Sequence, residues 1–301
     1  MRALGVVGGS GVYEIPGLSR VRELQVETPY GSPSDALVEA WLGETRLIFL
    51  PRHGRQHRLA PHAINYRANV CALKMLGAEQ IVSVSAVGSL QEHIAPGDVV
   101  VVDQYIDCTK RRAATFFDAD VVAHVSFADP VCPALSEAAA LATEQSGGRL
   151  HRGGTYVCIE GPQFSTRAES HLYRSWGASV IGMTALPEAK LAREAELPYA
   201  TLAFVTDYDC WHETEEDVSV EAILAVLRQN AALARETVRR LCEQLPDPAT
   251  SPAATALRSA ILTPPEQRSP AALERLSWLL GEVPAPRGDV NDPTPARSSG
   301  T

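Results

Sequence analysis

The sequence has no apolar run long enough to cross a bilayer, which takes about 20 consecutive apolar residues. A membrane-spanning protein is therefore excluded. The first nine residues are too few and too rich in glycine for a secretory signal peptide. We expect a cytoplasmic protein.

Basic charge is also scarce, because 27 Lys and Arg stand against 36 Asp and Glu and leave a net charge of −9. This balance argues against a general nucleic-acid or anionic-membrane binder, although a local anion pocket stays open. The six cysteines are scattered without a CxxC pair, so we expect free thiols. No His, Cys or Asp cluster has metal-ligand spacing, and we predict neither a metal nor another cofactor.

The common nucleotide-binding signatures are missing as well. A glycine-rich turn over 8–11 follows the first expected strand, but it has neither the GxGxxG spacing nor the Walker lysine. Glycines let a backbone turn sharply and approach a ligand closely, and Ser10 adds a hydroxyl and an amide for an anion. This turn alone is weak evidence for a site.

Strand-like and helix-like segments alternate along the chain, and 45% of the residues are hydrophobic. This pattern predicts the α/β class, with a largely parallel or mixed sheet flanked by helices, in one large domain or two smaller ones. After residue 245 the composition turns to Pro, Ala, Ser and Thr. We expect 246–301 to be a partly disordered tail with one short helix over 270–281, capped by Ser269.

Two carboxylates follow the most apolar strand of the chain. The run 199–204 reads as a strand buried on both faces, and Asp207 and Asp209 come directly after it, beside Tyr208 and Trp211. Ligand chemistry in α/β proteins lies at the open ends of such strands. Carboxylates among aromatic side chains lose solvation and can donate protons near pH 7. The alternative is two solvated loop acids.

Hydrogen-bond donors stand at the ends of several other expected strands. They are Ser10, Arg52 and His53, Ser85 and Ala86, and Thr184. The planar guanidinium of arginine matches phosphate or carboxylate oxygens. If the strand ends meet, these residues form one anion pocket of phosphate size.

A second pocket, for a flat protonatable ring, is predicted beside the first. Phe164 lies in a polar turn before a helix, where Thr166 and Glu169 form an expected capping box. Phe164 could stack on a ligand ring or pack in the core. Phe164 and Met183 would line the ring pocket with the two acids. An anion beside a heteroaromatic ring, without a metal or dinucleotide motif, suggests phosphate used as a substrate.

Over about Gly5 to Leu245 the sequence resembles the 5′-methylthioadenosine phosphorylases, within the trimeric purine nucleoside phosphorylase group. The motifs that carry the resemblance, in chain order, are GVVGGSG (5–11), RHGRQH (52–57), NYRAN (65–69), SAVGSL (85–90), EGPQFSTRAES (160–170), MTALPEA (183–189) and TDYDCW (206–211). The resemblance implies one domain over 1–245, with a central twisted mixed sheet flanked by helices.

The resemblance also implies residue roles. Phosphate would be bound by Ser10, Arg52, His53, Ser85, Ala86 and Thr184, and nucleoside by Phe164, Ser165, Met183, Asp207, Tyr208 and Asp209. Val220, Ile223 and Leu224 would enclose the methylthio group, and His124 would reach a neighbouring subunit's site in a homotrimer. Ser replaces the family's usual Thr at positions 10 and 85, which keeps the hydroxyl.

The implied reaction is reversible phosphorolysis of 5′-methylthioadenosine to adenine and 5-methylthioribose 1-phosphate, with Asp207 as general acid and Asp209 on the N6 amine. Three alternatives stay open. They are phosphorolysis of adenosine or 6-oxopurine nucleosides, hydrolysis by water, and a silent nucleoside-binding protein.

Overall fold

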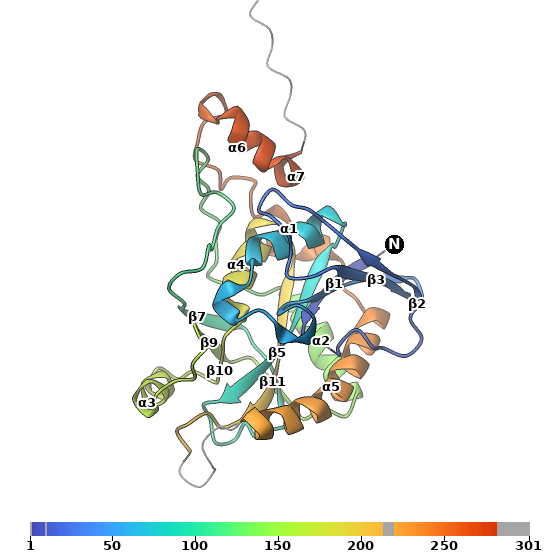
Figure 1. Cartoon of the computed structure of the whole chain (residues 1–301), viewed down its shortest axis with the longest axis vertical. Coiled ribbons are helices and arrows are strands. Elements are labelled where there is room, and N and C mark those ends of the chain that lie inside the picture. Colours follow the sequence, from blue (N-terminus) through green and yellow to red (C-terminus); the bar gives the residue numbers. More distant parts are fainter. Residues whose placement is uncertain (1, 10, 213–219, 282–301) are drawn as a thin grey trace, which may run out of the picture.

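The computed structural model describes residues 2–9, 11–212 and 220–281, and at 220–225, 227 and 228 it describes the backbone alone (Figure 1). Within these residues the strands form one mixed sheet, with β5 at a branch point that pairs with β1, β10 and β11. The strands are β1 (Arg2–Gly8), β2 (Ser19–Leu24), β3 (Leu37–Leu42), β4 (Thr45–Pro51), β5 (Gln80–Ser89), β6 (Val99–Val101), β7 (Gln104–Cys108), β8 (Leu150–Arg152), β9 (Thr155–Ile159), β10 (Val180–Gly182) and β11 (Tyr199–Asp207).

This sheet contains both parallel and antiparallel pairings. β1 runs parallel to β4 and β5, and β5 runs parallel to β11. β3 is antiparallel to β4, and β10 is antiparallel to β5. The prediction of an α/β fold with a mixed central sheet is confirmed.

Helices cover both faces of the sheet, as Figure 1 shows. They are α1 (Tyr66–Met75), α2 (Pro133–Gln145), α3 (Arg167–Ser175), α4 (Ala185–Glu194), α5 (Val220–Glu243), α6 (Pro270–Arg275) and α7 (Ser277–Leu280). None of these helices is both long and apolar enough to cross a membrane, within the described residues.

Alternate strand residues enter two separate cores. Val7 and Ile48 pack with α1 and α4 on one face, and Val6 and Leu47 pack with α2 and α5 on the other. This is the two-residue period of a strand whose two faces are both covered. The strands therefore read as continuous apolar runs in the sequence.

Capping residues in the sequence predict the start of some helices but not of others. The capping box of Thr166 and Glu169 is present at the start of α3, as predicted. Helix α1 begins at Tyr66 under an Asn65 cap, because Pro61–Ala63 forms a separate 3-10 turn. Helix α2 was not predicted, although Pro133 stands at its first turn.

Residues 246–281 pack on the body, in contrast to the linker-like segment that their composition suggested. Ser269 caps α6 through its side chain, and α7 follows directly. The ring of Trp278 lies edge-on to Phe116 at a centroid distance of 4.9 Å. Leu276 is fully buried. Apolar burial therefore holds this segment on the body.

We expect Leu276→Ala to lower the free energy of unfolding by about 2–5 kcal/mol, because it empties a fully buried position. Urea denaturation measures this change. Leu141→Ala on α2 is the matched control, since Leu141 is 38% exposed and should change stability by about 0.5 kcal/mol or less. Equal effects of the two substitutions would mean that the segment contributes no core.

Candidate active site

The two predicted acids lie at an irregularity in the ladder between β11 and β5. Val205 pairs with Val87 and Asp207 pairs with Gly88, so one residue of β11 is left over between them. Such a bulge re-aims the side chain that follows it. A Cβ atom at Gly88 would lie 2.8 Å from Asp207 Oδ1 and 3.3 Å from the Cβ of Asp209. Glycine at position 88 therefore leaves room for both acids.

Burial raises the pKa of both carboxyl groups. Asp207 Oδ1 accepts a hydrogen bond from the Asp209 amide at 2.8 Å, and Oδ2 lies 2.6 Å from the Thr206 hydroxyl. Burial raises the pKa of Asp207. Burial, together with the charge of Asp207, raises the pKa of Asp209 to about 6, although the nearby Ser170 hydroxyl opposes the shift. The pair can therefore hold a proton near neutral pH.

Arg52 is buried and already ion-paired. Its Nε and Nη2 donate to the Glu188 carboxylate at 2.8 and 3.1 Å, Nη2 also donates to Ser83 Oγ and Val7 O, and Nη1 donates to Val84 O. Burial lowers the pKa of Arg52, but Glu188 more than offsets this and the pKa is raised. Of the five guanidinium N–H groups, one on Nη1 is left for a ligand.

The hydroxyls of Ser85 and Thr184 lie together. Their oxygens are 3.2 Å apart, and both residues are buried. Thr184 precedes α4 without capping it through its side chain. Ala86 is exposed in a strand whose other residues are buried. The structure thus brings two predicted phosphate residues into direct contact, next to the exposed Ala86 of β5.

His53 is held as a neutral ring in this region. Its Nδ1 must donate to Leu59 O, 2.9 Å away, because a carbonyl only accepts. The ring stacks on His57 at a centroid distance of 4.0 Å, and burial lowers the pKa of His53 to about 4. In this tautomer Nε2 is an acceptor, so its partner must carry a hydrogen, as hydrogen phosphate does.

The loop before α3 lies against the acid turn. Cys210 Sγ contacts Ser165 O at 3.3 Å. The Ser165 hydroxyl is buried without a hydrogen-bond partner in the part of the chain that the structure describes, and Phe164 is 51% exposed. Phe164 is therefore not a core residue. The hydroxyl of Tyr208 donates to the backbone carbonyl of Glu92 at 3.3 Å, and the ring of Tyr208 stacks on His212.

Sequence reasoning missed Arg112, which joins two segments of the site. Its Nη1 donates to Met183 O at 2.7 Å and to Leu186 O at 2.6 Å, and Nη2 donates to Glu160 O at 2.7 Å. The side chain is 1% exposed. Nothing in the sequence distinguishes Arg112 from its neighbour Arg111, because the acceptors lie about 50 and 70 residues away.

Several predicted site residues are not joined to this cluster. Ser10 lies outside the described residues, and so do the side chains of Val220, Ile223 and Leu224. His124 is exposed, and its amide donates to Ala260 O at 2.9 Å. No described contact joins His124 to the other site residues of the same chain.

Comparison with known proteins places this geometry in a family. A model described as the phosphorylase superfamily matches residues 3–243. The S-methyl-5′-thioadenosine phosphorylase of Geobacter sulfurreducens is 54% identical, over 93% of this chain and 98% of its own. This chain belongs to the methylthioadenosine phosphorylase family. The family resemblance predicted from the sequence motifs is confirmed.

Solved structures of phosphorylases agree with this assignment. A methylthioadenosine phosphorylase from an antarctic soil metagenomic library superposes with a TM-score of 0.88 at 49% identity, and the match covers 93% of this chain and 99% of that one. The Schistosoma mansoni methylthioadenosine phosphorylase in complex with adenine has a TM-score of 0.80 at 35% identity, covering 86% and 99%.

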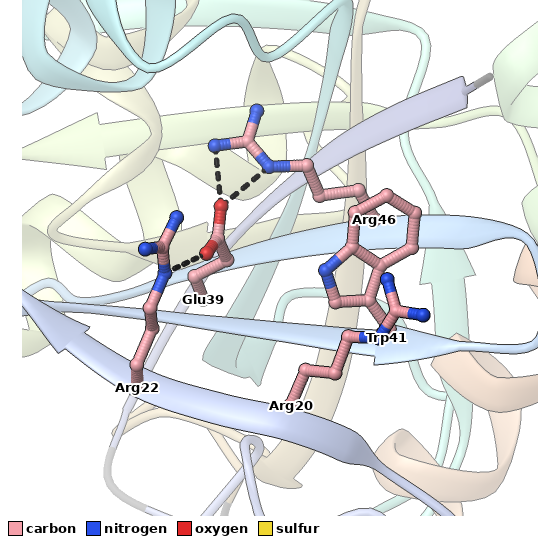
Figure 2. Close-up of a pocket in the computed structure, with 5 residues that line it drawn as sticks. All are labelled: Arg20, Arg22, Glu39, Trp41 and Arg46. Atoms are coloured by element: carbon pink, nitrogen blue, oxygen red, sulfur yellow. Dashed lines mark hydrogen bonds and ion pairs between the residues drawn. The ribbon is translucent and has the colours of Figure 1, made fainter.

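A surface hollow on this phosphorylase lies apart from the predicted site residues. Figure 2 shows its lining from β2, β3 and β4, namely Arg20, Arg22, Glu39, Trp41 and Arg46. Glu39 pairs with both Arg22 and Arg46, and the hydrogen bond from Arg22 holds its pKa below the usual range. The third arginine, Arg20, lies over the Trp41 ring at 5.4 Å. Because each of these side chains already has a partner, we assign the hollow no ligand.

Among the residues at 2–9, 11–212 and 220–281, no three His, Cys, Asp or Glu side chains are placed to hold a metal ion.

For the phosphorylase we expect Asp209→Asn to gain stability relative to the native protein as the pH rises from about 4 to about 7. The pKa of Asp209 rises from an unfolded value of about 3.9 to about 6 in the fold. A raised acid pKa stabilises the fold below the unfolded value, and this contribution is lost as the pH passes the folded value. Denaturation of both proteins at several pH values measures the difference. A difference independent of pH would contradict the assignment.

Proposed function

We propose that this chain catalyses the reversible phosphorolysis of 5′-methylthioadenosine to adenine and 5-methylthioribose 1-phosphate. The observation that carries the proposal is the pair of buried carboxyls at the bulge, both with a raised pKa. The hydroxyl of Ser85, inside β5, and that of Thr184, just after β10, lie 3.2 Å apart and would supply donors for phosphate. The names of relatives at about 50% identity support the same reaction.

In the proposed mechanism Asp207 is the general acid. The bond between C1′ and N9 breaks, its electron pair passes to the purine, and the proton of Asp207 moves to N7. A phosphate oxygen then bonds to C1′, which has become cationic, and the phosphate charge stabilises this centre before attack. Asp209 would accept a hydrogen bond from the N6 amine. An ionised carboxylate repels the carbonyl of a 6-oxopurine, so the pair favours adenine.

Phosphate would be held by directional donors. These are the hydroxyls of Ser10, Ser85 and Thr184, the Ala86 amide and the Nη1 of Arg52. The Nε2 of His53 would instead accept a hydrogen bond from hydrogen phosphate. Binding of phosphate before reaction removes much of the entropic barrier. Phosphate is then a co-substrate, and no other cofactor is required.

The nucleoside pocket would draw on further residues. Phe164 would stack on the base, with Ser165, Met183 and Tyr208 beside it. Val220, Ile223 and Leu224 would surround the methylthio group, since apolar side chains favour it over a 5′-hydroxyl. Adenosine is the second candidate substrate, because solved relatives from Schistosoma mansoni are described as adenosine/methylthioadenosine phosphorylases.

A homotrimer, with His124 serving a neighbouring subunit, is part of the proposal. His124 is exposed, and Val122 and Leu262 beside it are exposed apolar residues joined by a backbone hydrogen bond. A subunit packed here would cover the apolar pair and bring His124 to its own site. The cytoplasmic location is supported by six free cysteines.

Asp207→Asn should lower adenine release from 5′-methylthioadenosine by about 100-fold or more, because the general acid is lost. The KM for phosphate should stay the same. Release is measured with and without phosphate, and then with adenosine and inosine. Asp103→Asn, at an exposed carboxylate, is the control and should leave turnover unchanged.

Unchanged turnover in Asp207→Asn would contradict the role of Asp207 as general acid. Release without phosphate would indicate a hydrolase, and binding without any release would indicate a silent nucleoside-binding protein.

His124→Ala should lower kcat/KM for 5′-methylthioadenosine by about tenfold, as the loss of one ligand hydrogen bond does. Co-expression with Asp207→Asn then tests the subunit arrangement. In mixed oligomers an intact Asp207 site can take His124 from the other variant, so activity should exceed the sum of the two variants alone. Activity no greater than that sum would mean that His124 acts in the site of its own chain, or that it acts in no site.

A further inference from the structure

We propose that Thr206 is a positioning residue whose hydroxyl turns between two acceptors as Asp207 gains and loses its proton. The inference rests on the proposed function, in which Asp207 is the general acid. Thr206 is the residue left over at the bulge between Val205 and Asp207, and it is 5% exposed. Its hydroxyl is therefore held by protein atoms in the described structure.

The hydroxyl of Thr206 faces two oxygens but has one hydrogen. Val87 O lies 3.1 Å from Thr206 Oγ1, and Asp207 Oδ2 lies 2.6 Å from it. A carbonyl oxygen only accepts, whereas a carboxyl oxygen can accept or, when protonated, donate. Both hydrogen bonds can form at the same time only if Asp207 supplies the second hydrogen.

Because Thr206 has one hydroxyl hydrogen for two acceptors, the hydrogen bonds can take two arrangements. When Asp207 is neutral, its Oδ2–H donates to Thr206 Oγ1, and the Thr206 hydroxyl donates to Val87 O. When Asp207 is ionised, the Thr206 hydroxyl donates to Oδ2 and leaves Val87 O. In both arrangements the Asp209 amide donates to Oδ1 at 2.8 Å, so the carboxyl keeps its place while its proton comes and goes.

The rotation of the Thr206 hydroxyl stabilises Asp207 when the proton is transferred to the purine. As the purine binds, the Oδ2–H bond swings from Thr206 to N7. The O–H bond then breaks, the N7–H bond forms, and the negative charge stays on Asp207. Thr206 donates to this new carboxylate, and a hydrogen bond to a charged oxygen is about twice as strong as a neutral one. Apart from the proton of Asp207 itself, the Thr206 hydroxyl hydrogen is the one atom of the pair that has to move.

Other titratable groups near Asp207 limit what a pH profile can report. Asp209 is its neighbour, and Glu169 lies close enough to raise the pKa of Asp209 further. The Cys210 thiol lies 4.0 Å from Asp209 Oδ2, and Tyr173 of α3 also interacts with Asp209. Burial raises the pKa of both groups above their usual values, so neither titrates near neutral pH. Near neutral pH the profile therefore reflects the two aspartates as a coupled pair.

The test compares Thr206→Val, which keeps the shape and removes the hydroxyl, with Thr206→Ser, which keeps the hydroxyl. The hydrogen bond from Thr206 lowers the pKa of Asp207. In Thr206→Val we expect kcat to fall about tenfold and the basic limb of kcat/KM to move up by about one pH unit, with the KM for phosphate unchanged. Thr206→Ser should restore both quantities to near the native values.

Thr201→Val is the matched control, because Thr201 lies buried in the same strand and bonds Tyr105 instead of an acid. It measures the loss of stability from a missing buried hydroxyl and should not move the basic limb. Thr206→Ala is a second hydroxyl-free variant, should Thr206→Val fail to fold. A fall in kcat without a movement of the limb would overturn the inference and leave Thr206 a packing role.

An infrared titration separates this inference from the proposed function. The carbonyl stretch of protonated Asp207 is identified by its loss in Asp207→Asn, and its pKa is read without any turnover. An upward shift of this pKa in Thr206→Val supports the inference even if no phosphorolysis occurs. An unshifted pKa overturns it even if the enzyme is active.

Discussion

A buried ion pair ties together four of the elements that carry the candidate site. The guanidinium of Arg52, at the end of β4, donates to Glu188 on α4 and to Ser83 on β5, and Tyr199 on β11 donates to the same carboxylate at 2.9 Å. Removing one charge of a buried pair typically costs about 3–5 kcal/mol, because the other charge then has no partner. The relative positions of these four elements therefore depend on both charges.

The same ion pair would determine how phosphate is bound at the proposed site. Because Glu188 balances the charge of Arg52, the donors at the strand ends act mainly through direction and not through net positive charge. The Ser85 and Thr184 hydroxyls and the exposed backbone at Ala86 fit this description. Hydrogen bonds of this kind select the shape of a phosphate, and they hold it less tightly than an unpaired arginine would.

The sequence predicted the parts of the site that depend on local pattern. Asp207 follows a strand that is apolar on both faces, and Thr184 precedes a helix, so both could be placed at the edge of the sheet. Glu188 and Arg112 could not be predicted, since their partners lie far along the chain, 136 residues away in the case of Glu188. The place of Thr206 depends on the register between β11 and β5, which no single strand encodes.

Residues 260–262 hold a loop at 122–124 in place. Ala260 O accepts from the His124 amide, Ala123 pairs with Ile261, and Leu262 donates to Val122 O at 2.8 Å. A ribosome releases the chain from its N-terminus onward. A nascent chain that already contains all of β11 still lacks these partners, so the loop takes its place only once residues 260–262 have been released, after the sheet can have formed.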